Sequence, residues 1–69
     1  MRNDLFLKQL GAKVQALRKL KGISVRALGA MCDTDYSNLS QFENGRINTN
    51  ILLLKTIAKQ LNVDLKDLL

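Results

Sequence analysis

The chain has 69 residues, 46% of them hydrophobic and 25% charged, and no proline; this balance is typical of one compact domain over residues 1–69. It has no histidine and a single cysteine, which excludes a histidine-based catalytic base or zinc site and an internal disulfide, and favours a reducing, cytoplasmic setting. Eleven Lys and Arg against six Asp and Glu give a net charge of +5, which suggests a polyanionic partner, while the longest apolar run, Ile51–Leu54, is too short to span a membrane.

A first helix is expected over about Asp4–Lys21, with Asn3 or Asp4 capping its start. Gly22 can end it in the left-handed conformation. Gly11, in its middle, either weakens the helix or lets another backbone come close. Hydrophobic side chains recur at spacings of three and four, the period of one helix face: Leu7, Leu10, Val14 and Leu17.

Two short helices are expected next. Ser24 is a good N-cap for a helix from Val25 to about Cys32, and Asp35 is a good N-cap for a second helix from Tyr36 to about Glu43. Asp33 and Thr34 break the chain between them. The side chains expected to point into the core are Leu28 and Cys32 from the first helix, and Leu39 and Phe42 from the second.

A fourth helix is expected over about Ile51–Leu61, capped by Thr49 or Asn50 and ended by Asn62. Its apolar residues in register are Ile51, Leu54, Ile57, Ala58 and Leu61. Asp64, with Asp67 three residues on, is expected to start a final short helix that carries Leu65, Leu68 and Leu69. No stretch alternates with period two for long enough to form a strand. The sequence therefore predicts a compact all-α fold of five helices.

The centre of the chain, residues 24–43, has the layout of a helix-turn-helix, which places its second helix in the major groove of DNA. The residues around it resemble the phage repressor/Cro (XRE) family of helix-turn-helix regulators. The resemblance covers about Leu10–Leu69 and rests on Gly22-Ile23-Ser24, Leu28, Leu39, Phe42-Glu43-Asn44-Gly45-Arg46, Leu54, Ile57-Ala58-Lys59, Leu61-Asn62-Val63, Asp64-Leu65 and Leu68-Leu69. It implies a lambda-repressor-like domain that binds double-stranded DNA sequence-specifically, as a small bacterial or phage-type transcriptional regulator such as a repressor.

The resemblance also implies roles for individual residues. It pairs Glu43 with Arg18 of the first helix. The residue pattern agrees independently, because Arg18 lies beside the apolar face of its helix and Glu43 comes directly after Phe42, which is expected in the core. The recognition helix spans about residues 35–43, and its expected base contacts, on the side opposite Leu39 and Phe42, are Tyr36, Ser37, Ser40 and Gln41. The expected phosphate contacts flank that helix: Arg26, Asn44, Arg46 and Asn48.

Several positions depart from the family's pattern. Val25 stands where a phosphate-binding Gln is usual, Gly29 where Ala is usual, and Asp33 where a turn Gly is usual. The positive charge is also displaced, because residues 1–22 carry six basic residues and one acidic residue, whereas residues 23–47 carry two basic and three acidic. A protein-interaction module that reuses the helix-turn-helix fold is therefore the alternative function, and Asp35 and Val25 give it some support.

Four leucines near the C-terminus leave two possibilities open. They complete the core of one chain, or they form an apolar patch that pairs two chains as a homodimer, as is common in the family: Leu52, Leu53, Leu68 and Leu69. No enzyme activity is expected, because Asp64 and Asp67 are read as capping residues and the four glycines form no phosphate-binding loop. No cofactor, metal site or small-molecule ligand is expected either.

Overall fold

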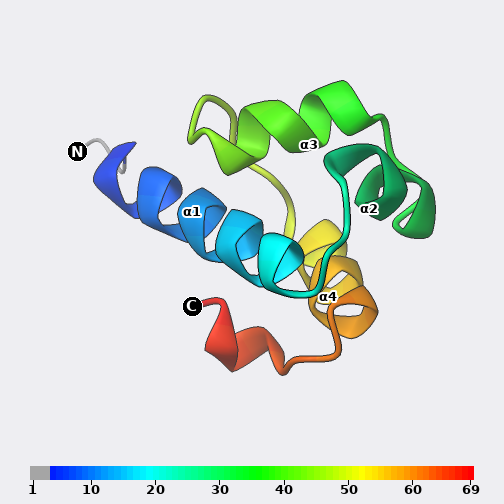
Figure 1. Cartoon of the computed structure of the whole chain (residues 1–69). Helices are drawn as coiled ribbons and strands as arrows, with labels where there is room; N and C mark the ends of the chain where they lie inside the picture. The colour runs from blue at the N-terminus through cyan, green and yellow to red at the C-terminus, as the bar shows by residue number, and fades with distance from the viewer. Residues whose placement is uncertain (1–3) are drawn as a thin grey trace.

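The computed structural model describes residues 4–69 of the chain. These residues form four α-helices and one short 3-10 helix, with no β-strand among them (Figure 1): α1 Asp4–Leu20, α2 Val25–Met31, α3 Tyr36–Glu43, α4 Ile51–Gln60 and η1 Leu65–Asp67. The radius of gyration is 10.9 Å, close to the value of about 11 Å expected for a globular chain of this length. The all-α, compact prediction is confirmed, and no helix within residues 4–69 is long and apolar enough to cross a bilayer.

The helices begin where side chains satisfy the free N–H groups of their first turns. Each predicted cap accepts a hydrogen bond from a backbone N–H, at 3.0 Å for Ser24, 3.1 Å for Asp35 and 2.8 Å for Asn50. Asn50, not Thr49, is therefore the cap of α4. Asn3, a predicted cap of the first helix, lies outside the described residues.

The helices end at residues in the left-handed conformation. Gly22 follows α1 with φ +69°, and Asn62 follows α4 with φ +60°. Asp33 lies between α2 and α3 with φ +55°, which agrees with its position in place of the usual turn glycine. Aspartate and asparagine tolerate this region better than other non-glycine residues, because their short polar side chains bond locally. The chain therefore reverses within a few residues between α2 and α3.

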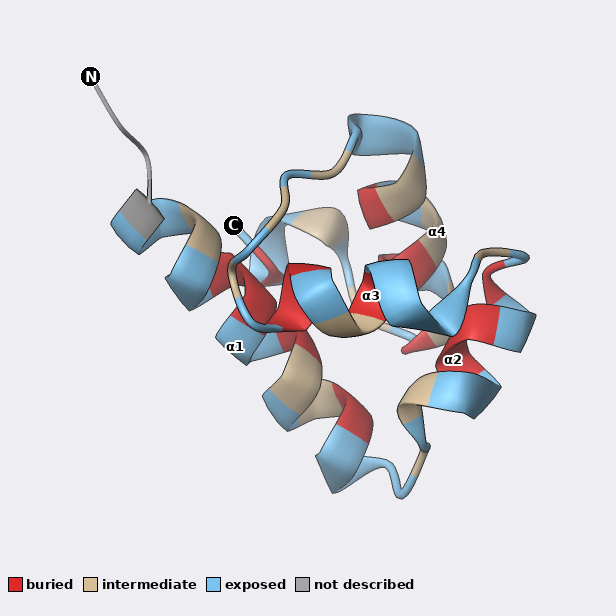
Figure 2. Cartoon of the chain, turned by 90° about the horizontal axis from the view of Figure 1, so that it is seen from above, coloured by how far each residue is buried: buried red, intermediate tan, exposed pale blue. Residues whose placement is uncertain are grey.

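The helices surround a core whose members come from all four α-helices and from the C-terminal segment (Figure 2): Leu10, Val14, Leu28, Cys32, Leu39, Phe42, Leu54, Ile57, Ala58, Leu61 and Leu68. The prediction that Ile51 joins this core is wrong, since its side chain is 53% exposed. Ile51 is the first residue of α4, and its side chain lies outside the core that Leu53 and Leu54 contact. Leu54, one turn later, is the first residue of the stripe to be buried.

The predicted fifth α-helix is wrong, because the segment after Asp64 is a single 3-10 turn. Its hydrogen bonds run from Asp67 N to Asp64 O and from Leu68 N to Leu65 O, both at 2.9 Å. One turn cannot repay the cost of nucleating an α-helix. Burial of Leu68, which is 1% exposed, holds the turn instead, and Asp67 accepts a hydrogen bond from the Asp64 N–H at 3.2 Å, as expected of a capping pair.

Helix α1 crosses the end of α3 at very close range, and Gly11 is the point of contact. A Cβ atom on Gly11 would collide with the carbonyl oxygen of Phe42 and lie 2.7 Å from that of Glu43. Of the two readings of Gly11, close approach of another backbone is therefore the correct one. This contact sets the distance between α1 and the helix that carries the candidate site.

Candidate nucleic-acid interface

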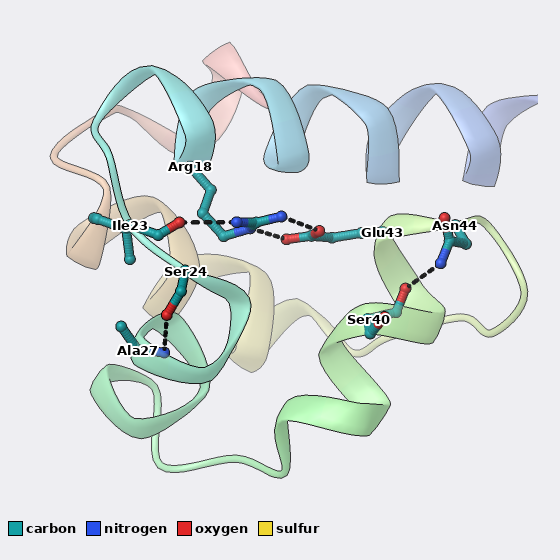
Figure 3. Close-up of polar contacts among 7 residues, drawn as sticks. All are labelled: Arg18, Ile23, Ser24, Ala27, Ser40, Glu43 and Asn44. Carbon is teal, nitrogen blue, oxygen red and sulfur yellow. Dashed lines mark hydrogen bonds and ion pairs between the residues drawn. The ribbon is translucent and has the colours of Figure 1, made fainter.

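Arg18 of α1 and Glu43 of α3 form a buried ion pair across that crossing (Figure 3). The Arg18 Nε atom lies 2.7 Å from Glu43 Oε2, and its Nη2 atom lies 2.9 Å from Oε1. The third donor, Nη1, bonds the carbonyl oxygen of Ile23 at 2.8 Å. The two side chains are only 9% and 2% exposed. The hydrogen bond to Glu43 raises the pKa of Arg18 above its ordinary value, against the opposing effect of desolvation.

This pair fixes the orientation of α3. Its two parallel hydrogen bonds hold guanidinium and carboxylate in one plane, and the bond to Ile23 ties the same guanidinium to the turn that leads into α2. One side chain of α1 therefore holds both the entry to α2 and the end of α3. The arrangement positions the helix-turn-helix, because all three nitrogens of the guanidinium donate to protein oxygens and both carboxylate oxygens of Glu43 accept from Arg18.

The four predicted base-contact residues lie on the outer side of α3. Tyr36, Ser37 and Gln41 are exposed, and Ser40 is partly exposed. The opposite side of the same helix is buried through Leu39, Phe42 and Glu43. Figure 2 shows the outer surface of α3 free of covering elements. The helix therefore presents a polar face of hydroxyl and amide groups, which can donate and accept hydrogen bonds at base edges.

Tyr36 differs from the other three because it is already in contact with Arg26 of α2. The Arg26 Nη2 atom donates to the Tyr36 hydroxyl oxygen at 3.1 Å, and the guanidinium carbon lies 4.5 Å from the centre of the ring. This contact joins a predicted phosphate contact to a predicted base contact. The sequence does not predict it, because the two residues are ten positions apart on different helices.

The predicted phosphate contacts beyond α3 have different surroundings. Asn44 folds back, and its Nδ2 atom donates to the Ser40 carbonyl at 3.0 Å (Figure 3). Asn48 accepts a bond from the Thr49 N–H at 2.8 Å through Oδ1, which leaves its Nδ2 group as the donor. Arg46 is exposed. The loop therefore offers the Arg46 guanidinium and the Asn48 amide, while one amide donor of Asn44 serves the end of α3.

Lys8 and Asn38 lie beside this surface although the sequence does not single them out. A Cβ atom on Gly45 would be 2.8 Å from the Lys8 Cα atom and 2.6 Å from its Cγ atom, so α1 places Lys8 against the loop that carries Arg46. Asn38 lines a hollow of about 480 Å³ between α3 and the start of α4. The charge surplus of the first helix is the one sequence feature that points to Lys8 as a DNA contact. The contact of Lys8 with the loop depends on the crossing of α1 and α3, which the sequence does not show.

The fold and part of the sequence match known proteins. The restriction-modification controller protein C.AhdI from Aeromonas hydrophila aligns with a TM-score of 0.91 at 25% identity, over 94% of this chain and 98% of that one. The clp gene regulator ClgR from Corynebacterium glutamicum aligns with a TM-score of 0.86 at 28% identity, over 88% of this chain and 65% of that one. An HTH_3 family transcriptional regulator from Vibrio cholerae aligns with a TM-score of 0.88 at 25% identity, over 97% of this chain.

The chain spans 65% of that ClgR chain, 78% of the ClgR chain in a second structure, and 38% of the Vibrio cholerae protein. No curated protein sequence matches it significantly. The family model named Helix-turn-helix (HTH_3) matches residues 14–68, which include the whole of α2, α3, α4 and η1 together with Arg18. Since this match covers most of the chain and includes the ion pair and the exposed face of α3, the chain belongs to the HTH_3 helix-turn-helix family.

Proposed function

We propose that the chain is a sequence-specific, double-stranded DNA-binding transcriptional regulator that inserts α3 into the major groove. The observation that carries the proposal is that α3 exposes one polar side while its other side is buried and its end is held by the Arg18–Glu43 pair. A helix that reads DNA must project its side chains into the groove and keep a fixed orientation, and α3 meets both conditions. The proposal includes no catalytic step and assigns the protein to the cytoplasm.

Three residues of α3 have the groups and the freedom to read bases. Gln41 can donate to and accept from an adenine edge, and the hydroxyls of Ser37 and Ser40 can bond several bases. They are exposed or partly exposed on one side of the helix. Tyr36 shares that side, but its ring and hydroxyl are engaged by Arg26.

Backbone contacts are proposed at both ends of α3. Arg26 lies at the first end, and Arg46 and Asn48 follow the second end, where Lys8 of α1 packs against Gly45. These groups place cations on two sides of the helix that would enter the groove, as positioning on a duplex requires. Lys8 also brings part of the charge surplus of α1 to this surface, which offsets the near-neutral charge of the motif itself. Asn44 retains a second amide hydrogen for a weaker contact.

Homodimerisation is proposed through part of the predicted leucine patch. Leu68 is 1% exposed and Leu53 packs against the core, so these two leucines complete the core of one chain. Leu52 is 71% exposed and Leu69 57% exposed, and they remain available for a second copy. The longest dimension of one chain is 33 Å, so two chains side by side suit recognition helices about one DNA turn, roughly 34 Å, apart.

The alternative, an interaction module without strong DNA binding, loses its two supporting observations. The Asp35 carboxylate caps α3 by accepting the Ser37 N–H at 3.1 Å, so an acidic residue is needed there for a structural reason. Val25 is half-buried and packs against the core. A valine in place of the usual phosphate-binding glutamine therefore has a structural role, and it does not indicate a new binding surface. Neither residue indicates a protein partner.

The proposal is tested by selecting bound duplexes from a random pool and titrating the recovered duplex at several potassium chloride concentrations. We expect recovery of a two-fold-symmetric site, affinity that falls steeply with salt, and a loss of sequence preference at one base pair when Gln41 is changed to Ala. Lys66→Ala, an exposed change on η1, is the matched control and should leave the preference unchanged. No enrichment in the pool, together with no binding at low salt, would contradict the proposal.

A further inference from the structure

The contact between Arg26 and Tyr36 has two components made by one guanidinium. Its Nη2 donates to the tyrosine hydroxyl at 3.1 Å, and its carbon lies 4.5 Å from the ring centre. A cation over an aromatic ring is attracted by the negative face of the ring. The hydroxyl and the face of Tyr36 are therefore both committed to Arg26, although the residue is 41% exposed and stands among the proposed base contacts.

The backbone around this contact is tightly fixed. A Cβ atom on Gly29 would lie 3.1 Å from the Tyr36 Cα atom and 3.1 Å from the Thr34 carbonyl oxygen, so the start of α3 lies against α2. Gly29 is one helical turn after Arg26, and Asp35 caps the helix that begins with Tyr36. The two side chains therefore meet because the start of α3 is held against α2, and close packing at a small residue is what permits it.

The chemistry of Tyr36 determines how much positive charge Arg26 keeps for another partner. A carboxylate would neutralise the guanidinium, whereas the phenol of Tyr36 is neutral. Among residues 5–69, no carboxylate lies within ion-pair distance of Arg26. A guanidinium has five N–H donors, and the tyrosine uses one of them. Arg26 therefore keeps its full charge and most of its donors while its position is held.

We propose that Tyr36 is a positioning residue that holds Arg26 to bind a phosphodiester of the DNA backbone, and that it does not read a base. This inference rests on the proposed function and specifies its site. The planar fork of an arginine matches two oxygens of a phosphate. Arg26 is carried by α2, beside the recognition helix, where residues contact the backbone of a duplex more often than the base edges. Holding the side chain in place lowers the entropy lost on binding.

The test compares the wild type with Tyr36→Phe, Arg26→Gln and the double variant. Each is titrated by fluorescence anisotropy, over a series of potassium chloride concentrations, against the duplex selected from the random pool and against a mixed-sequence duplex. Tyr36→Phe removes the hydroxyl and keeps the ring. Gln41→Ala serves as the matched base-reading variant. Thermal melts of all variants check that the fold is retained, as expected because the side chains of Arg26 and Tyr36 are exposed.

We expect Arg26→Gln to weaken binding to both duplexes by the same factor and to reduce the salt slope by about one unit. Tyr36→Phe should weaken binding to both duplexes equally, by about 2- to 10-fold, as loss of one hydrogen bond predicts. The double variant should bind no worse than Arg26→Gln within a factor of about two, because the two residues act as a unit. Gln41→Ala should weaken binding to the selected duplex only.

Two outcomes overturn the inference while the proposed function stands. In the first, Tyr36→Phe weakens binding to the selected duplex alone and shifts the preference at one base pair, as a base-reading residue would. In the second, the effects of the two single variants multiply in the double variant. If the wild type binds neither duplex at low salt, the proposed function itself fails and the inference falls with it.

Discussion

Removing Arg18 is the most informative test of how the recognition helix is held. Arg18→Ala would delete two hydrogen bonds to Glu43 and one to the Ile23 carbonyl. It would also leave a carboxylate that is 2% exposed without its partner. Loss of one member of a buried pair costs about 3–5 kcal/mol. A chain of this length has roughly 3–10 kcal/mol of total stability, so the change removes a large part of it.

The assay is thermal unfolding followed by circular dichroism, with Lys19→Ala as the control. Lys19 is the next residue of α1 and is exposed, so its loss should change stability by about 0.5 kcal/mol or less. The melting temperature of Arg18→Ala should fall by about 12 °C or more, at roughly 4–8 °C per kcal/mol for a domain of this size. Equal melting temperatures for Arg18→Ala and Lys19→Ala would refute the assigned role.

A double replacement separates the charge from the space it fills. Arg18→Met with Glu43→Leu removes both charges and leaves apolar side chains of similar length in the crossing. Such replacements are often neutral or stabilising by about 1–4 kcal/mol, because no buried charge is left alone. The double variant should therefore melt well above Arg18→Ala. If it melts as low as Arg18→Ala, the loss comes from packing and not from an unpaired carboxylate.

Three further predictions concern stability and reactivity. Gly11→Ala should lower the free energy of unfolding by about 2 kcal/mol in urea titrations, because the new Cβ meets two carbonyl oxygens. Helix propensity alone favours alanine by about 1 kcal/mol, and Ala16→Gly at an exposed position of α1 measures that propensity. A stabilised Gly11→Ala variant would contradict the close crossing of α1 and α3. Burial raises the pKa of the Cys32 thiol, so a thiol reagent should label it far more slowly in the folded protein than in denaturant, and equal rates would show an accessible thiol. The pKa of Arg18 is raised on folding, so the stability that the charged Arg18 gives the fold is fully present below the unfolded pKa and is lost only as the pH rises through the folded pKa. The melting-temperature difference between wild type and Arg18→Ala should therefore stay constant over about pH 6–9. A decline of that difference within this range would contradict the prediction.

The helices were predictable from the sequence because their signals are local. Spacings of three and four, together with the caps Ser24, Asp35 and Asn50, fix where α2, α3 and α4 begin. Left-handed residues such as Gly22 and Asn62 fix where α1 and α4 end. The sequence predictions differ from the structure where tertiary context decides: the last segment is held by one buried leucine and forms a 3-10 turn, and Ile51 at the start of α4 lies outside the core.

The candidate site was predictable only in part, since its contacts join distant segments. The outer side of α3 follows from helical period alone. The pairing of Arg26 with Tyr36 depends on how closely α2 approaches α3 at Gly29, and the position of Lys8 depends on the crossing of α1 over Gly45. Charge counts along the chain place the positive surplus on α1, but the crossing of helices determines which part of it faces the recognition surface.

The central claim, that the outer side of α3 enters the major groove, is tested most directly by adding the selected duplex to isotope-labelled protein and recording amide chemical shifts. We expect the largest changes at Ser37, Ser40 and Gln41, with further changes near Arg26 and Arg46 and little change at Lys59 on α4. Changes that spare α3 and concentrate on another surface would contradict it.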